Sequence, residues 1–217
     1  WIVHDTKIKD YNTIVTAYSK SGYKSSRIIT WSDPADWWDV DWNFRKLINL
    51  NSSLVESDQN NFPVLLSLTD TDLRDDAQSD GDDIAFTDIS GNQLDHEIEY
   101  FNGGTGELVA WVNVTSLSSV SDTQIYMYYS NSGCSSQENA ADLWSSYSMV
   151  YHLSEPSGTS GAGSVSDSTG NTGGTPSVGL SFGETGKIGN STDFSSGTGS
   201  AFGTLGSSVL TADSSFA

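Results

Sequence analysis

The stretch that most constrains the fold is residues 80–129, where apolar and polar residues alternate in short runs separated by turns. The alternation is clearest along residues 108–114 and 125–129, and Gly/Asn-rich turns lie at 90–92 and 102–104. A period of two residues bounded by such turns is typical of antiparallel strands with one buried face. The sequence therefore predicts an all-β chain built on an antiparallel, jelly-roll-like β-sandwich.

The same alternation predicts which side chains face the core, because successive residues of a strand point to opposite faces. His96, Ile98 and Tyr100 are expected to point inward, with the acidic residues between them in solvent. On the last strand two sets are expected on opposite faces: Ile125, Met127 and Tyr129 on one, and Tyr126 and Tyr128 on the other.

Charge is distributed unevenly along the chain, whose net charge is −19. Residues 1–30 hold five basic and two acidic groups, a balance of +3, while residues 31–217 hold four basic and 26 acidic groups, a balance of −22. Such an acidic surface disfavours nucleic acid and anionic membranes. No apolar run approaches the roughly 20 residues of a membrane-spanning helix. The first residue is Trp, so a processed chain or a fragment is expected.

Residues 1–36 are predicted to form an N-terminal extension. Short strands are expected at 13–18 (TIVTAY) and 27–31 (RIITW), but the segment has too few apolar residues to build a core of its own. It is therefore expected to add a strand to the following sheet or to the sheet of another subunit. The basic head could pair with the acidic body of its own chain or of a neighbour.

An aspartate-rich segment at 70–88 is a candidate calcium site. Calcium takes six to eight oxygen ligands, which carboxylates supply well. The spacing differs from an EF-hand, and a merely solvated acidic loop is the alternative. The candidate Ca²⁺ ligands are Asp80, Asp82, Asp83 and Asp88.

Three tryptophans, Trp37, Trp38 and Trp42, lie within six residues. Flat indole rings could stack on sugars and form a carbohydrate-binding platform, while packing at the edge of the sandwich is the favoured alternative. Asn51, Asn113 and Asn190 each begin an N-x-Ser/Thr sequence and are candidate glycosylation sites.

The strongest catalytic candidate is the run Asp95, Glu97 and Glu99, because residues i and i+2 of a strand lie on one face about 6.5–7 Å apart. That spacing could serve a glycosidase pair, but an outward, solvated acidic face is favoured and no catalytic residue is predicted. The three histidines (His4, His96 and His152) lack metal-ligand spacing. The lone Cys134 excludes an internal disulfide, and a small-residue filler is expected there rather than a reactive thiol.

Several motifs in order resemble the domain-of-unknown-function 2341 family of archaeal and bacterial surface and secreted proteins. They are WNFRK (42–46), NFPV (61–64), DGDDIAFTD (80–88), LDHEIE (94–99), AWV (110–112) and IYMYY (125–129). The resemblance covers roughly residues 37–145, which are expected to form one β-sandwich domain. It implies no agreed catalytic residues.

After residue 129 the chain becomes rich in Ser, Gly and Thr. A helical turn is predicted at 140–144 and a strand at 147–153. The motifs YHL (151–153), DSTG (167–170) and GKIG (186–189) resemble the opening of a laminin-G or concanavalin-like lectin domain. Residues 146–217 are therefore expected to be the N-terminal part of a second, lectin-like sandwich.

Together these features favour a non-catalytic extracellular surface or filament protein that makes structural or adhesive contacts through β-strands. Its expected partners are neighbouring copies of itself or other surface proteins. The alternatives are a carbohydrate-binding module of a secreted protein and a polysaccharide hydrolase.

Overall fold

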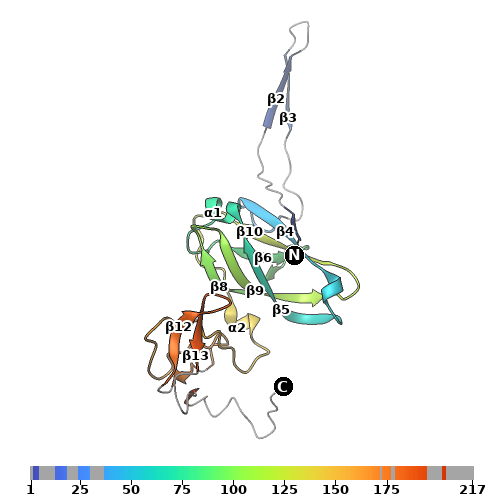
Figure 1. Ribbon diagram of the computed structural model, residues 1–217. Coiled ribbons are helices and arrows are strands. Elements are labelled where there is room, and N and C mark those ends of the chain that lie inside the picture. Colours follow the sequence, from blue (N-terminus) through green and yellow to red (C-terminus); the bar gives the residue numbers. More distant parts are fainter. Residues whose placement is uncertain are drawn as a thin grey trace.

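The computed structural model of the chain describes residues 2–4, 13–18, 24–29, 37–171, 173–176, 179–194 and 202–203. It shows an all-β protein in which two antiparallel sheets share one hydrophobic core, with a few short helices (Figure 1). The predicted fold class is thus confirmed. In the part of the chain that the structure describes, no helix is both long and apolar enough to cross a membrane.

The larger sheet of the sandwich has five strands in the order β1-β4-β10-β6-β7, so neighbouring strands come from distant parts of the sequence. Every pairing in it is antiparallel. Its strands are β1 (Ile2–His4), β4 (Phe44–Leu50), β10 (Thr123–Tyr129), β6 (Ala85–Asp88) and β7 (Gln93–Leu94).

The smaller sheet has three antiparallel strands in the order β5-β9-β8, which are β5 (Gln59–Thr69), β9 (Glu107–Leu117) and β8 (His96–Asn102). Strand β5 is an edge strand. Pro63 lies within this strand. Proline has no backbone N–H, and an edge strand tolerates it because one side of the strand has no neighbour to receive a hydrogen bond.

The core between the sheets follows the predicted alternation. On β10, Ile125, Met127 and Tyr129 are buried in it with at most 1% of each residue exposed. The opposite face of β10 carries Tyr126 and Tyr128, as predicted, and Tyr128 belongs to a second apolar cluster outside the core. Burying each large side chain contributes about 1.5–3 kcal/mol. The two-residue period therefore sets both the orientation and the main stabilisation of this strand.

Strand β8 follows the predicted pattern only as far as Ile98. His96 is fully buried and Ile98 packs against the core, but the register then shifts between Ile98 and Tyr100. Because of this β-bulge, Phe101 rather than Tyr100 packs against the core. The predicted inward position of Tyr100 is therefore wrong.

A short helix, α1 (Thr71–Asp76), lies inside the segment expected to be a loop. Asp70 caps it, because its carboxylate accepts a hydrogen bond from the backbone N–H of Asp72 at 2.8 Å. Gly106 packs so closely that a Cβ atom there would lie 1.8 Å from the carbonyl oxygen of Asp70. It also has φ of +74°, so only glycine fits the contact between α1 and the β8–β9 turn.

The N-terminal extension contributes three of the described strands. Strand β1 pairs with β4 of the same chain, Val3 lying opposite Ile48. Strands β2 (Thr13–Tyr18) and β3 (Lys24–Ile29) form a hairpin with each other; β3 begins earlier than predicted, and the last two residues of the predicted strand, 30–31, lie outside the described residues. Figure 1 shows this hairpin standing away from the sandwich.

Beyond the sandwich, helix α2 (Ala140–Leu143) lies where a helical turn was predicted. No strand forms at 147–153, so that prediction is wrong; the N–H and C=O of Val150 instead bond to Asp167 Oδ1 and Ser168 N. Two small two-stranded sheets follow, made of β12 (Ser181–Thr185) with β13 (Asn190–Asp193) and β11 (Thr175–Pro176) with β14 (Phe202–Gly203). Whether they open a lectin-like sandwich stays a prediction.

Candidate functional site

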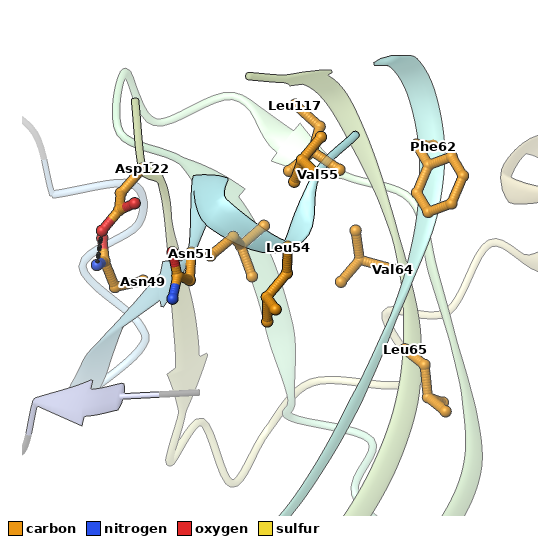
Figure 2. Close-up of a pocket in the computed structure, with 10 residues that line it drawn as sticks. Asn49, Asn51, Leu54, Val55, Phe62, Val64, Leu65, Leu117 and Asp122 are labelled. Carbon is orange, nitrogen blue, oxygen red and sulfur yellow. Dashed lines mark hydrogen bonds between the residues drawn. The ribbon is translucent and has the colours of Figure 1, made fainter. Parts of the chain in front are cut away.

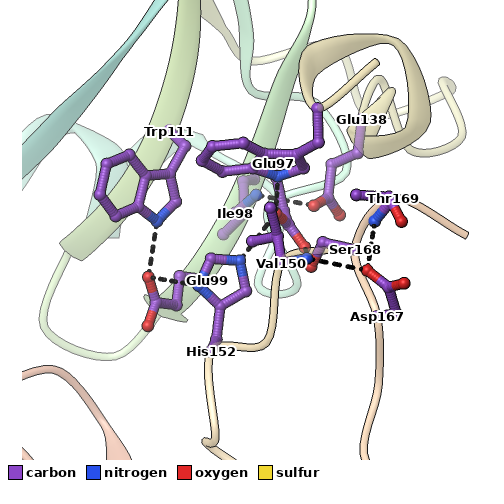
Figure 3. A network of polar contacts seen from close by, with 11 residues as sticks. Glu97, Ile98, Glu99, Trp111, Glu138, Val150, His152, Asp167, Ser168 and Thr169 are labelled. Carbon is purple, nitrogen blue, oxygen red and sulfur yellow. Dashed lines mark hydrogen bonds and ion pairs between the residues drawn. The ribbon is translucent and has the colours of Figure 1, made fainter. Parts of the chain in front are cut away.

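A dense polar network surrounds Glu97, on the outer face of β8 (Figure 3). Its carboxylate accepts hydrogen bonds from Trp144 Nε1 at 2.6 Å and from Ser168 Oγ at 2.7 Å, and it contacts His152 Nε2 at 3.0 Å. The three partners come from chain segments that follow the sandwich. The network therefore fastens the downstream segment to the smaller sheet.

Glu99, the residue at the β-bulge, adds a second carboxylate to the same network. It accepts a hydrogen bond from Trp111 Nε1 at 2.7 Å, and its Oε2 lies 3.5 Å from His152 Nδ1. The imidazole thus sits between two carboxylates, with the Trp111 ring stacked beside it at a centroid distance of 6.2 Å. A histidine donates from both ring nitrogens only when it is protonated, so this geometry favours the imidazolium ion.

The pKa values of the pair move in opposite directions. Burial alone would lower the pKa of His152, but its hydrogen bond to Glu97 and the negative charges of Glu97, Glu99 and Glu155 together raise it. Burial alone would raise the pKa of Glu97, but the hydrogen bonds from His152, Ser168 and Trp144 together lower it. Both shifts favour a charged pair at neutral and mildly acidic pH.

These contacts correct the predicted solvent exposure of the acidic run, whose glutamates lie on the outer face as predicted but are covered there. Only 16% of the Glu97 side chain and 9% of the Glu99 side chain are exposed, so neither is a solvated surface residue. Asp95 precedes β8 and accepts a hydrogen bond from Asn139 at 2.9 Å. Trp111, directly opposite Glu97 in the strand register, was the missed signal, since an outward tryptophan beside outward acids indicates a covered face.

His96 is part of the core and not of this network. Its ring packs edge-on against Phe86 at a centroid distance of 5.1 Å. Burial lowers its pKa to about 4, with only partial compensation from the nearby backbone at Leu94 and Ile84. His96 is therefore a neutral, buried residue of the core. The side chain of His4 is outside the described part of the structure.

The free edge of β8 is closed by the segment that leads into α2. The carboxylate of Glu138 accepts a hydrogen bond from Ile98 N at 2.7 Å, and Asn139 N donates to the carbonyl oxygen of His96 at 2.9 Å. A side chain and a loop thus occupy backbone groups that a further strand would otherwise pair with. The opposite edge strand, β5, pairs only with β9 in the described residues.

The tryptophan cluster lies on the outer face of the five-stranded sheet. Trp42 is 6% exposed, and its indole N–H donates to the carbonyl oxygen of Asp83 at 2.8 Å. The Trp38 ring packs on Trp42 at a centroid distance of 4.6 Å. Trp37 lies against Arg45, whose guanidinium is 4.8 Å from its ring centroid. Only Trp37 and Trp38 retain partly exposed rings for a ligand.

The four aspartates considered as calcium ligands have separate surroundings. Asp83 is fully buried and accepts backbone hydrogen bonds from Gln78, Ser130 and Asn131. Among the described residues no three His, Cys, Asp or Glu side chains gather in a way that could hold a metal ion. Calcium binding stays a prediction. Asp88 bonds within its own turn, to Ser90 and Asn92, and Asp80 and Asp82 lie in the preceding turn.

The remaining candidates also have defined positions. Asn51 and Asn190 are exposed, while Asn113 on β9 is half-buried. Cys134 lies beside Gln78 and the carbonyl oxygen of Asn131. Burial and the charges of nearby aspartates raise the pKa of its thiol, which lowers its reactivity.

The fold and the network define an all-β sandwich whose smaller sheet is covered on one face and one edge by the chain that follows it. Residues 80–161 match the model of the family described as Domain of unknown function (DUF2341). The match confirms the resemblance over this stretch, and it extends past residue 145, where we expected the domain to end. No curated protein and no solved structure matches the chain.

Proposed function

We propose that this protein is a non-catalytic structural or adhesive component of an extracellular surface or filament, and that copies associate through β-strand contacts. The observation that carries the proposal is the pairing of β1, an edge strand of the five-stranded sheet, with β4. Three residues at the start of the chain complete an edge of the five-stranded sheet. About 40 residues separate His4 from Phe44, so β1 is connected to the strand it pairs with by a long stretch of sequence.

A strand that pairs within its own chain can form the same contacts with a neighbouring copy, because exchange replaces an intramolecular edge contact by an identical intermolecular one. The opposite charges of the basic head and the acidic body favour that association and make it sensitive to salt. The outer edge of β5, for which the described part of the chain supplies no strand partner, offers a second place for main-chain pairing.

The surroundings of the carboxylates support a non-catalytic role. A general acid or base must be free to exchange a proton with substrate. Both oxygens of Glu97 are engaged by protein donors, and Glu99 is engaged by Trp111 and His152. The surroundings of Glu97 and Glu99 are therefore those of residues that hold β8 and the downstream segment together. A polysaccharide hydrolase is the least favoured alternative, and glucan hydrolysis that is lost on Glu97→Gln would establish it.

The test of the proposed function is assembly of the full chain. Analytical ultracentrifugation over a range of protein concentrations, with electron microscopy, is expected to show concentration-dependent assembly. Val3→Pro is expected to weaken it at least tenfold, because proline cannot donate to the ladder with β4. Val3→Thr, which keeps a β-branched residue, is the matched control. A wild-type chain that stays monomeric throughout would refute the proposal.

A carbohydrate-binding module is the second candidate, favoured by the partly exposed rings of Trp37 and Trp38. Binding on a polysaccharide array is expected to disappear in the double substitution Trp37→Ala and Trp38→Ala if these rings form the platform. Trp42→Ala is unsuitable for this test, because that ring is buried and its loss would disturb the fold.

A further inference from the structure

An apolar groove opens between the two sheets on the side of β5, away from the Glu97 network. It has a volume of about 390 Å³ and is lined mainly by Leu50, Leu54, Val55, Phe62, Val64 and Leu117. Figure 2 shows Leu54 and Val55, from the segment around the short helix η1 (Ser52–Leu54), on one side and Val64 and Phe62 of β5 on the other. The groove therefore lies directly beside the outer edge of β5, which has no strand partner among the described residues.

Two of the lining side chains are unusually exposed for their size. Leu54 is 80% exposed and Phe62 is 43% exposed, although Phe62 follows the inward alternation of β5. An apolar groove next to a free strand edge is the surface that an added β-strand recognises: backbone pairing supplies affinity and the groove accepts alternate side chains.

The groove has one acidic lining residue, and two further acidic residues flank its lining segment in the sequence. Asp122 lines it, and Glu56 and Asp58 follow the η1 segment. Hydrogen bonds from Ser52 and Asn49 lower the pKa of Asp122. Hydrogen bonds from Ser119 lower that of Asp58. Both carboxyls are therefore ionised at neutral pH, and the ligand that suits this groove is an apolar, extended segment with positive charge.

Such a segment exists in the chain itself. The hairpin β2–β3 has the strand sequences TIVTAY and KSSRII, and residues 1–30 hold five of the nine basic residues. Each six-residue strand spans about 20 Å, shorter than the eleven-residue edge strand β5. The hairpin stands away from the sandwich of its own chain (Figure 1).

We propose that the groove beside β5 receives the β2–β3 hairpin of a second copy of this chain. The inference rests on the proposed function and adds a second contact between copies to the exchange of β1. Apolar residues of the incoming hairpin enter the groove, one of its strands runs along β5, and its basic residues face Asp122, Glu56 and Asp58. Each copy then offers both a donor hairpin and an acceptor groove, so that association continues from copy to copy.

The test uses the full chain and a matched pair of substitutions. Leu54→Asp places a carboxylate in the groove, and Ile89→Asp places one at a 54% exposed residue in the turn between β6 and β7, at the far end of the larger sheet. Both sites are exposed, so both variants are expected to keep the wild-type Tm. Leu54→Asp is expected to raise the dissociation constant for self-association about 30-fold, and Ile89→Asp less than threefold.

A second pair of measurements tests the donor. Lys24→Glu with Arg27→Glu is expected to weaken association at low salt, and raising the ionic strength is expected to weaken the wild-type association in the same way. An effect of salt that is unchanged by the double substitution would overturn the assignment of the hairpin as donor.

The outcomes separate this inference from the proposed function. If the wild type assembles, Val3→Pro blocks assembly and Leu54→Asp behaves like Ile89→Asp, association through β1 stands and the hairpin–groove contact is wrong. If the wild type stays monomeric at every concentration, both proposals fall, and a hairpin that occupies its own groove becomes the explanation. Only a selective, concentration-dependent loss with Leu54→Asp supports the groove.

Discussion

The two edge strands of the smaller sheet, β8 and β5, have opposite surroundings. At β8 the chain supplies a cover: Glu138 and Asn139 bond to its backbone, and Glu97 anchors the segment that follows. β5 pairs with β9 on its inner side, but on its outer side the described residues supply no strand partner, and an apolar groove lies beside the strand. An uncovered strand edge invites pairing with another chain. One edge of the sheet is thus covered by described residues of the chain, and the other is the edge at which we propose association.

The largest expected effect comes from removing the anchor at the β8 end. Glu97→Ala leaves Trp144, Ser168 and His152 without their shared acceptor. We expect a loss of roughly 3 kcal/mol of stability, because removing one member of a largely buried, hydrogen-bonded pair leaves the other member buried without its partner. Thermal unfolding and hydrogen exchange of residues 146–171 measure it.

The control for that substitution is Glu107→Ala, which removes an exposed carboxylate from β9 of the same sheet. It is expected to change stability by less than about 0.5 kcal/mol. Equal effects of the two substitutions would mean that the β8 end is not fastened by Glu97, and the contrast between the two ends would lose its basis.

A change at the β5 end is expected to alter association and leave stability nearly unchanged. Phe62→Lys puts a positive charge at the mouth of the groove, where it repels a basic partner. Self-association is expected to weaken about tenfold, or about 1.4 kcal/mol. Sedimentation equilibrium measures it, with Phe62→Leu as the apolar control. A tenfold change in both variants would show that ring packing, not charge, governs the contact.

A smaller effect is expected from opening the covered edge. Glu138→Ala leaves the N–H of Ile98 without its carboxylate acceptor. The cost is expected to be about 1 kcal/mol, and the uncovered edge is expected to increase association. Glu138→Gln, which keeps an acceptor oxygen, should behave nearly as wild type. Urea unfolding and light scattering report the two consequences separately.

Much of the sandwich fold could be predicted from the sequence, whereas the contrast between its two edges could not, for physical reasons. The two-residue period correctly orients β10, whose pattern runs unbroken from Ile125 to Tyr129. A bulge leaves no periodic signal, so the inward place of Phe101 was not predicted. Residues 147–153 alternate like a strand, but the backbone groups of Val150 bond to Asp167 and Ser168 instead. Contacts between segments far apart in sequence, such as Glu97 with Ser168, leave no local pattern.

The smallest expected effect is the pH dependence of the β8 end. The raised pKa of His152 adds stability that is fully present below pH 6.5 and is lost as pH rises through its higher folded value. The lowered pKa of Glu97 adds stability that is present above pH 4.5 and is lost as pH falls through its lower folded value. Protection of residues 146–171 from hydrogen exchange should therefore be greatest between about pH 4.5 and 6.5.

His152→Gln is the matched variant for this profile. It keeps a donor for Glu97 but cannot become charged, so the loss of protection on the alkaline side should disappear while the acidic side remains. An alkaline loss that persists in this variant would assign the effect to another group.

The close contact at Gly106 has a consequence for recognising distant relatives of this chain. The carbonyl oxygen of Asp70 occupies the space of a Cβ atom, so no other amino acid is compatible with α1 packed on the β8–β9 turn. Surface sequences can diverge freely over time, but a lineage that retains this packing cannot replace that glycine. A glycine at the equivalent turn, between two paired strands and opposite a helix cap, is therefore expected in every relative that keeps this packing.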